Sequence, residues 1–332
     1  MSAVSLGSDA LRAPTLQAVM RALAGALPES RGAEPGAPLE MSAQSAEPPR
    51  LRSAQVIEGH DFHARRVDGE PEVGLTAFLD GTQESKVACY VHNVPVVLGT
   101  VAAVIRDRRN QRMFTWRHAV QKRLYAPKSQ VSNAEWRALG SIGLELSDSS
   151  EAVGDELPAE HPLAIRESVI KRVQHDRERL ENDLARAWCE RETRRLMVDG
   201  GIVGSEAVAR SECAVGVVKS HRTLYVSGAA LFVTLGLRQG ERSSVFLISS
   251  DRRPSAASWY LRLRNNQGYD PMWGLVRVEI AAGASGDALT RRADEVSRWI
   301  LAEVAPVSLP DGRWHTMVYG VRDCEEFLRA IT

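Results

Sequence analysis

Two short segments of this 332-residue chain end in an aspartate followed by a glycine. Phe78-Leu79-Asp80-Gly81 and Met197-Val198-Asp199-Gly200 each read as an apolar strand with a carboxylate at its end. Burial of a carboxylate is costly unless the group is paired or binds a cation. A single Asp-Gly is typical of a turn after a strand, but two matching copies on either side of a charged helix favour one shared site.

Carboxylate oxygens are the ligands that Mg²⁺ and Mn²⁺ prefer. Two such ions about 4 Å apart can activate a water molecule and stabilise the leaving oxygen in phosphodiester hydrolysis. A glycine after each aspartate allows a sharp backbone turn and leaves room for a phosphate. We therefore expect Asp80 and Asp199 to be catalytic metal ligands.

A third carboxylate is expected from the long charged helix that precedes Asp199. Glu181 is the first choice and Glu167 the alternative, with Glu178 and Glu190 behind them. Glu167 and Glu181 are fourteen positions apart, so they share a helix face but lie roughly 21 Å apart along the axis. Only one of them can reach Asp199. For any single glutamate on a charged helix, a solvated helix face is the default explanation.

Lys219 follows the apolar strand Val215-Gly216-Val217-Val218. A lysine at this position is able to contact a scissile phosphate as a point charge beside the carboxylates. Alternatively, its long side chain extends from the strand end into solvent.

Residues 106–125 are basic and contain aromatic side chains. Aromatic rings stack on single-stranded bases at roughly 1–3 kcal/mol each, and basic groups bind phosphates in a salt-dependent manner. The candidates for DNA contact here are Arg108, Arg109, Arg112, Trp116 and Arg117. Two further candidates, on later strands, are Tyr260 and Arg277. An ordinary surface hairpin with its aromatics turned to the core, a core tyrosine and a surface arginine are the competing interpretations.

The elements that must position these residues follow from hydrophobic periodicity. Strands are predicted over 75–80, 86–90, 94–105, 196–199, 214–219, 245–249, 258–264 and 275–281. Helices are predicted over 162–195, 227–237, 287–304 and 325–331. Strands, then a long helix, then mixed strands and helices predict an α/β fold with a mixed central sheet flanked by helices.

The first 54 residues differ in composition from the rest. Residues 9–27 predict an amphipathic helix, and the Ala-, Pro- and Ser-rich stretch 28–52 predicts a flexible linker. We expect an N-terminal helical arm over 1–54 and a main domain over 55–332 with a surface insertion at about 106–160. The helix either serves a partner or packs on its own domain.

Composition excludes several classes of protein. The formal net charge is zero and 44% of residues are hydrophobic, so any nucleic-acid contact must come from a local basic patch. Four scattered cysteines predict free thiols and a reducing compartment. Without a signal peptide or membrane span, the expected location is cytoplasmic. The chain has no P-loop and is not expected to be a motor itself.

Several motifs, in this order, resemble the NurA nuclease family, which works with HerA-type hexameric translocases. The matching segments are Leu79-Asp80-Gly81-Thr82, Arg177-Glu178-Arg179-Leu180-Glu181, Val198-Asp199-Gly200-Gly201, Val215-Gly216-Val217-Val218-Lys219, Trp259-Tyr260-Leu261 and Val276-Arg277-Val278-Glu279. The resemblance covers about residues 70–330. It implies an RNase H-like fold, Mn²⁺-dependent endonuclease and exonuclease activity on DNA, and a homodimer seated on a hexameric ATPase ring.

The same resemblance implies that Asp80, the helix glutamate and Asp199 hold Mn²⁺ or Mg²⁺, with two ions expected. The family has a histidine on its last helix that completes the site. This chain has only acids in the segment from Tyr319 to Glu325, and Asp323 is the replacement candidate. The family's proline after the tyrosine is Gly320 here.

Two other functions remain open. One is a catalytically weak DNA-binding or scaffolding subunit of a translocase complex, which the altered C-terminal segment favours. The other is a phosphohydrolase acting on nucleotides, which the extended basic and aromatic stretch argues against.

Overall fold

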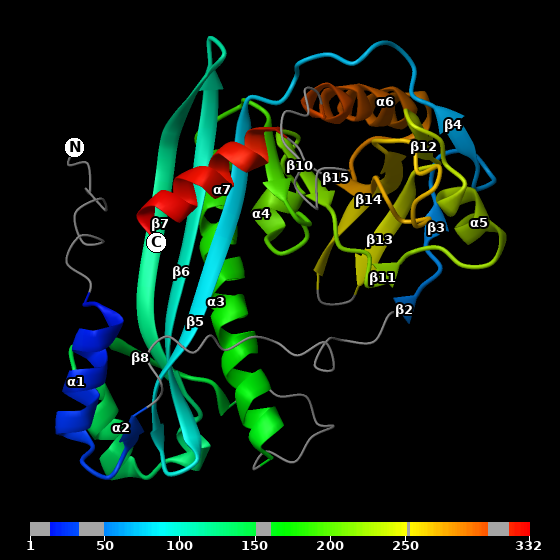
Figure 1. Ribbon diagram of the computed structural model, residues 1–332. Coiled ribbons are helices and arrows are strands. Elements are labelled where there is room, and N and C mark those ends of the chain that lie inside the picture. Colours follow the sequence, from blue (N-terminus) through cyan, green and yellow to red (C-terminus); the bar gives the residue numbers. More distant parts are fainter. Residues whose placement is uncertain (1–13, 33–49, 151–160, 251–252, 305–318) are drawn as a thin grey trace.

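The computed structural model describes residues 14–32, 50–150, 161–250, 253–304 and 319–332 (Figure 1). Most of the predicted linker, at 33–49, and the acidic stretch 151–160 lie outside the described residues. The described strands form a 13-stranded mixed sheet and a separate two-stranded one.

Three long antiparallel strands begin the central sheet. They are β5 (Ala77–Val91), β6 (Val94–Arg109) and β7 (Arg112–Ala126). Helix α3 (Pro162–Cys189) follows and leads to β9 (Leu196–Asp199), which runs parallel to β5, and β10 (Ala214–Val218) runs parallel to β9. The strand order β7-β6-β5-β9-β10 is that of an RNase H-like core. The predicted α/β class with a mixed sheet flanked by helices is confirmed.

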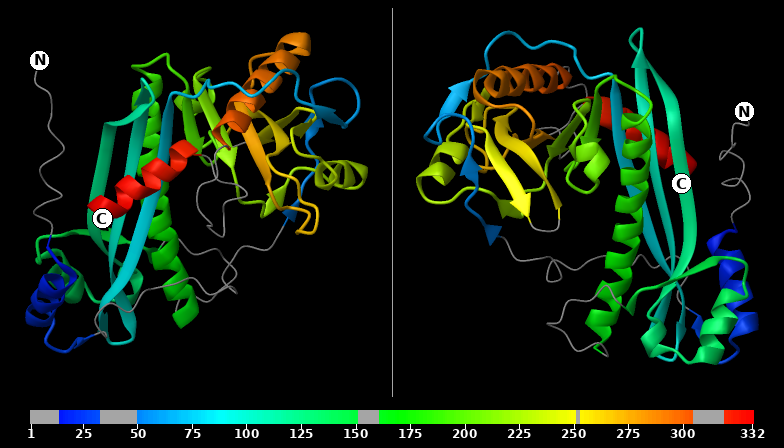
Figure 2. Two further views of the ribbon diagram at one scale, coloured as in Figure 1. Left: turned by 45° about the horizontal axis from the view of Figure 1, so that its top comes forward. Right: turned by 180° about the vertical axis from the view of Figure 1, so that it is seen from behind.

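The second half of the chain extends the same sheet beyond β10. The added strands are β15 (Leu275–Ala281), β14 (Arg253–Arg262), β13 (Phe246–Ser250) and β12 (Glu241–Ser243). Three helices accompany them: α4 (Glu206–Ala209), α5 (Ala229–Leu235) and α6 (Gly286–Glu303). The last helix, α7 (Tyr319–Ile331), returns to β5 and β6. Helix α7 crosses one face of these strands and α3 lies on the other (Figures 1 and 2).

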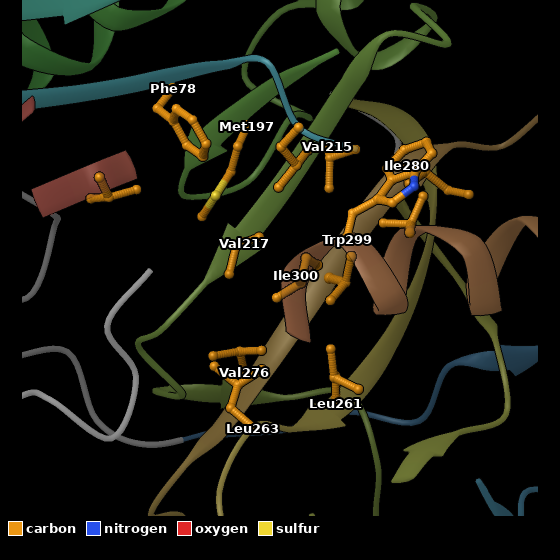
Figure 3. Packing of buried hydrophobic residues seen from close by; sticks show 14 of the residues in the cluster. Phe78, Met197, Val215, Val217, Leu261, Leu263, Val276, Ile280, Trp299 and Ile300 are labelled. Carbon is orange, nitrogen blue, oxygen red and sulfur yellow. The ribbon is translucent and has the colours of Figure 1, made fainter. Parts of the chain in front are cut away.

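Each face of the sheet buries its own apolar cluster, because successive side chains of a strand point to opposite faces. Phe78 and Met197 belong to the cluster with Trp299 and Ile300 of α6 (Figure 3). Leu79 and Val198 belong instead to the cluster beneath α3. Asp80 and Asp199 come next along their strands, so they share the face of Phe78 and Met197.

Helix α1 (Leu16–Ala26) packs on its own domain. Its residues Val19 and Leu23 are buried in a cluster with Leu98 of β6, Leu124 of β7 and Leu139 of the short helix α2 (Asn133–Gly140). Strand β1 (Arg31–Gly32) pairs with β5 beside it. Of the two interpretations of this helix, the structure supports a helix that covers apolar surface.

The chain after residue 50 lies against the opposite half of the sheet (Figure 1). The elements concerned are β2 (Arg50–Leu51), β3 (Gln55–Val56) and β4 (Ala64–Arg66). They pair in turn with β11 (Thr223–Leu224), β13 and β12. The described residues before position 67 therefore contact both halves of the sheet.

The predicted surface insertion at 106–160 is wrong over 106–126, which form the end of β6 and all of β7. The predicted strands 75–80 and 86–90 are one continuous strand, β5. After β7 come a short 3₁₀ helix (Lys128–Gln130), α2 (Asn133–Gly140) and β8 (Glu145–Asp148). Strand β8 pairs with β7, so it too belongs to the sheet.

Within the described residues, no helix combines the length and apolar character needed to cross a bilayer.

Candidate active site

Asp80 is a buried carboxylate near the start of β5. Burial and the neighbouring charge of Asp199 raise the pKa of Asp80 to about 7, although Lys219 and the Gly81 N–H oppose the shift. The Gly81 N–H donates to Asp80 Oδ1 at 2.8 Å. A carboxyl group with this pKa binds a proton or a cation readily near neutral pH.

Asp199 is the last residue of β9, the strand that pairs with β5. It lies one register position beyond the paired residues Leu79 and Val198. Lys219, directly after β10, lies with its Nζ 3.0 Å from Asp199 Oδ1 and Oδ2. The predicted proximity of Asp80, Asp199 and Lys219 is therefore present in the structure. Lys219 is partly buried here and makes an ion pair, so it does not extend freely into solvent.

Glu181 reaches the site from α3, on the opposite face of β5. A Cβ at position 81 would lie 2.1 Å from Glu181 Oε1, so the glutamate occupies the space that Gly81 leaves free. Burial raises the pKa of Glu181 to about 7; Arg177 lowers it, and Asp80 and Asp199 raise it. Arg177 Nη1 donates to Glu181 Oε1 at 2.7 Å.

The other candidates on α3 lie elsewhere. Glu167 makes a 4.0 Å ion pair with Lys171, one turn along the helix, and Glu178 pairs with Arg177. Only Glu181 lies over the Asp80-Gly81 segment. Of the glutamates considered from the sequence, the structure favours Glu181 for the site.

Helix α7 brings a different acid to Asp80 from the one predicted. Asp323 accepts a hydrogen bond from Arg106 Nε at 2.5 Å and so attaches α7 to β6. Glu325, two residues later, is the α7 carboxylate whose charge raises the pKa of Asp80. Glu325 was not predicted from the sequence, because helix register alone does not show which acid of this segment faces β5.

Gly320 explains how α7 lies so close to β5. A Cβ at position 320 would lie 2.4 Å from atoms of the Phe78 ring. The Cys324 thiol, one turn later, donates to the Phe78 carbonyl at 3.3 Å. A residue with a side chain at position 320 would move α7 away from Asp80.

A buried ion pair fixes the loop that follows Asp199. The Ile202 N–H donates to Glu279 Oε2 at 2.8 Å, and Arg277 Nη1 donates to Glu279 Oε1 at 2.6 Å. Gly201 lies against the same carboxylate, since a Cβ there would be 2.9 Å from Glu279 Oε2. Glu279 was not identified from the sequence as a site residue, because a glutamate in a buried strand gives no sign of its partner.

The predicted DNA-contacting residues divide into accessible and inaccessible groups. Tyr260 is fully buried and accepts a hydrogen bond from the Tyr225 N–H, and Arg277 is held by Glu279 and lies over the Tyr225 ring. The burial of Tyr260 contradicts its predicted contact with DNA. Arg277 is almost as buried. Its ion pair with Glu279 indicates that it helps to position the loop after Asp199.

The candidates on β6 and β7 are more exposed, with one exception. Arg109 is 58% exposed beside Asp107, and Arg112 is exposed at the tip of the hairpin. Arg117 lies over the ring of Trp116, which packs edge-on against Trp188 of α3. The exception is Arg108, which pairs with Glu303 of α6. A polyanion can therefore contact Arg109, Arg112 and Arg117. Trp116 is partly engaged in packing against the core.

The donor set has the chemistry that a hard divalent cation requires. Asp80, Asp199, Glu181 and Glu325 offer only oxygen ligands, and their mutual repulsion would be relieved by a positive ion. As the side chains lie, no three acidic, histidine or cysteine groups in the described part of the chain are close enough together to hold one ion. Lys219 and Arg177 now supply the positive charge to Asp199 and Glu181.

No protein-family model and no curated protein sequence matches this chain. Among solved structures, the chain is similar to the NurA nuclease from Sulfolobus solfataricus, with a TM-score of 0.48 and 10% sequence identity. The alignment covers 80% of this chain and 82% of that one. The similarity is weak, and the site described above stands on this chain's own residues.

Proposed function

We propose that this protein is a divalent-metal-dependent DNA nuclease whose active site contains Asp80, Glu181 and Asp199. The observation that carries the proposal is the convergence of these acids, with Glu325, from β5, α3, β9 and α7, where burial and repulsion raise the pKa values of Asp80 and Glu181 to about 7. Acids that destabilise one another in this way are typical of functional sites.

Mn²⁺ or Mg²⁺, when bound, would supply Lewis-acid activation of water and neutralise charge on the phosphate. Asp80, Glu181 and Asp199 would hold it, with Glu325 nearby. Lys219 brings a positive charge to the same point. Its ammonium group can give up its hydrogen bond to Asp199 and donate to a phosphate oxygen instead. Arg177 and Gln83 orient the side chain of Glu181, since Arg177 Nε also donates to Gln83 Oε1 at 3.1 Å.

The hairpin of β6 and β7 supports a polymeric substrate. Arg109, Arg112 and Arg117 follow the exposed part of this hairpin, and Phe114 is 49% exposed among them. A nucleotide phosphohydrolase would not need such an extended basic surface. In this proposal the protein acts as a homodimer in DNA end processing with a HerA-type hexameric ATPase.

A nuclease assay with a chelator and then with added Mn²⁺ tests the proposal, on supercoiled plasmid and on linear single strands. Cleavage should require the metal. Asp80→Asn or Asp199→Asn should lower it by more than the about 10–100-fold typical of losing a residue that only orients a metal ligand. Asp183→Asn is the matched control, because Asp183 is an exposed acid on α3 paired with Arg186. Cleavage retained in both site variants would overturn the proposed site.

The ion pairs at the site favour one second candidate function. Lys219 and Arg177 already neutralise Asp199 and Glu181, which is the arrangement expected of a DNA-binding subunit that does not cleave. In that case the wild-type protein would bind DNA in a salt-dependent manner and release no product with Mn²⁺ or Mg²⁺.

A further inference from the structure

Two of the four cysteines lie side by side at the edge of a large cavity. Cys189 ends α3, and Cys213 immediately precedes β10. Their sulfur atoms are 3.7 Å apart, and both thiols are free. Both residues line a cavity of about 1400 Å³, together with Ser211, Arg194 and Arg210. Small solutes therefore have a route to these sulfurs.

From this geometry we propose that Cys189 and Cys213 form a peroxide-reactive dithiol that is reversibly oxidised to an intramolecular disulfide. This modification site is separate from the proposed nuclease residues and does not depend on the proposed function.

The local chemistry distinguishes the two sulfurs. The hydrogen bond between the two thiols lowers the pKa of Cys213 to about 6 against the effect of burial, and the Ser211 hydroxyl, 3.1 Å from Cys213 Sγ, lowers it further. The hydrogen bond with Cys213 and burial raise the pKa of Cys189, although Ser211 opposes the shift. The thiolate is the reactive form of cysteine. Cys213 is therefore the group that attacks first, and Cys189 the group that resolves.

The reaction balances with hydrogen peroxide as the oxidant. The Cys213 thiolate attacks one peroxide oxygen, the O–O bond breaks, and the released hydroxide takes a proton to become water. The Cys189 sulfur then attacks the Cys213 sulfenic acid, forming the S–S bond and releasing a second water. One peroxide is reduced to two waters, and two thiols are oxidised to one disulfide. A disulfide needs its sulfurs about 2.05 Å apart, so a small local movement of the two thiols suffices.

The other two cysteines provide internal controls. Burial raises the pKa of Cys89 to about 11, and burial with the charges of Asp80 and Asp323 raises the pKa of Cys324 well above its usual range. Cys213 is buried as well, but it lines the cavity, and neither Cys89 nor Cys324 does. A buried thiol that no cavity reaches is a poor nucleophile.

The experiment treats the reduced full-length protein with a few equivalents of hydrogen peroxide, alkylates the remaining thiols in denaturant, and maps the peptides by mass spectrometry without reduction. The expected product has two alkylated cysteines, Cys89 and Cys324, and one cross-linked peptide pair joining Cys189 to Cys213. Dithiothreitol should restore all four thiols. Denaturing gel electrophoresis without reductant should show no new covalent dimer.

Two variants separate the roles. Cys189→Ser should leave a Cys213 sulfenic acid that dimedone traps, and Cys213→Ser should abolish both the cross-link and the trapped adduct. Cys213→Ala serves as a second variant if the serine protein lacks the wild-type circular dichroism spectrum. Cys89→Ser should react as the wild type does. Oxidation spread evenly over the four cysteines, or an equal yield of the same cross-link from protein unfolded in urea, would overturn the proposal.

Discussion

Asp80, Glu181 and Asp199 come from three elements, and each is placed there by a specific local feature. Gly81 provides the space for Glu181, and the parallel register of β5 and β9 places the two aspartates on one face. Arg177 and Lys219 then offset part of the repulsion among the three acids. The site is held by these contacts even though its acids repel one another.

Exchanging one glutamate on α3 for glutamine tests this arrangement at the scale of the residue. Glu181→Gln should abolish most metal-dependent cleavage, because glutamine keeps the size of the side chain but loses the charge that a hard cation needs. Glu167→Gln should keep nearly full activity. Glu167 is a close control, since its side chain is 18% exposed and that of Glu181 15%. Initial cleavage rates with Mn²⁺ decide, and loss of activity in the Glu167 variant alone would contradict this assignment.

The sequence identified the residues whose chemistry is unusual for their position. An aspartate at the end of an apolar strand stands out twice, and the structure brings Asp80 and Asp199 together. Glu325 and Glu279 did not stand out, because their importance comes from helix register and from a partner on a distant strand. Tyr260 was misassigned for the reverse reason, since a tyrosine in an apolar strand looks the same whether its hydroxyl is bound internally or exposed.

At the scale of elements, two strands were not predicted with their full length because parts of them are charged or polar. β7 contains many basic residues, and its first half is bordered only by β6, so its side chains remain partly exposed. The middle of β5, from Thr82 to Lys86, is polar and lies beneath α3. Because of this polar segment, the sequence pattern predicted two strands where the structure has one. Hydrophobic periodicity indicates a strand where its side chains are buried. It does not indicate one where the side chains are half exposed. β10 and β15, which are buried on both faces, were predicted within one residue of their bounds, whereas the start of β14 was predicted five residues too late.

Helix α1 provides a test at this scale. Leu23 is fully buried among β6, β7 and α2, so Leu23→Ala should lower the free energy of unfolding by about 2–5 kcal/mol. Gln17→Ala, on the exposed side of the same helix, should change it by less than about 0.5 kcal/mol. Urea denaturation followed by circular dichroism measures both. If α1 were instead a free arm for a partner, the two substitutions would be equally neutral.

At the scale of the whole molecule, one buried group of charges joins the N-terminal segment to the distal half of the sheet. Arg242 donates to both oxygens of Glu58, at 2.7 and 2.8 Å, and to Asp294 of α6 at 2.6 Å. Glu58 also accepts from the Val245 N–H and the Thr290 hydroxyl. Since Glu58 lies between β3 and β4, this network fixes both strands to the core.

The same network should make stability depend on acid pH. Burial alone would raise the pKa of Glu58, but its hydrogen bonds and the charge of Arg242 lower it from 4.5 to about 2. A carboxyl group whose pKa is lowered by folding stabilises the folded state at any pH above its pKa in the unfolded chain. For Glu58 this contribution is lost as the pH falls from about 4.5 to about 2. The full contribution is about 3 kcal/mol.

Denaturation curves at pH 7 and pH 3 measure the larger part of this contribution, because pH 3 lies between the unfolded and the folded pKa. Glu58→Gln should be destabilised by about 3–5 kcal/mol at pH 7, because the buried Arg242 keeps Asp294 but loses the Glu58 carboxylate, and it should lose less stability between pH 7 and pH 3 than the wild type does. The exposed Glu70→Gln serves as control and should follow the wild-type profile. Parallel pH profiles for wild type and Glu58→Gln would show that Glu58 does not hold its charge in this way.

The pairing of β4 with β12 has a consequence for synthesis of the chain. Ala64 pairs with Ser243, and these residues are 179 positions apart (243 − 64). At about 5–20 residues per second, the ribosome needs roughly 10–35 s to make that stretch. Throughout this interval the nascent β4 lacks its partner strand. Its two arginines, Arg65 and Arg66, are the kind of charged residues that protect such an unpaired edge from aggregation until β12 emerges.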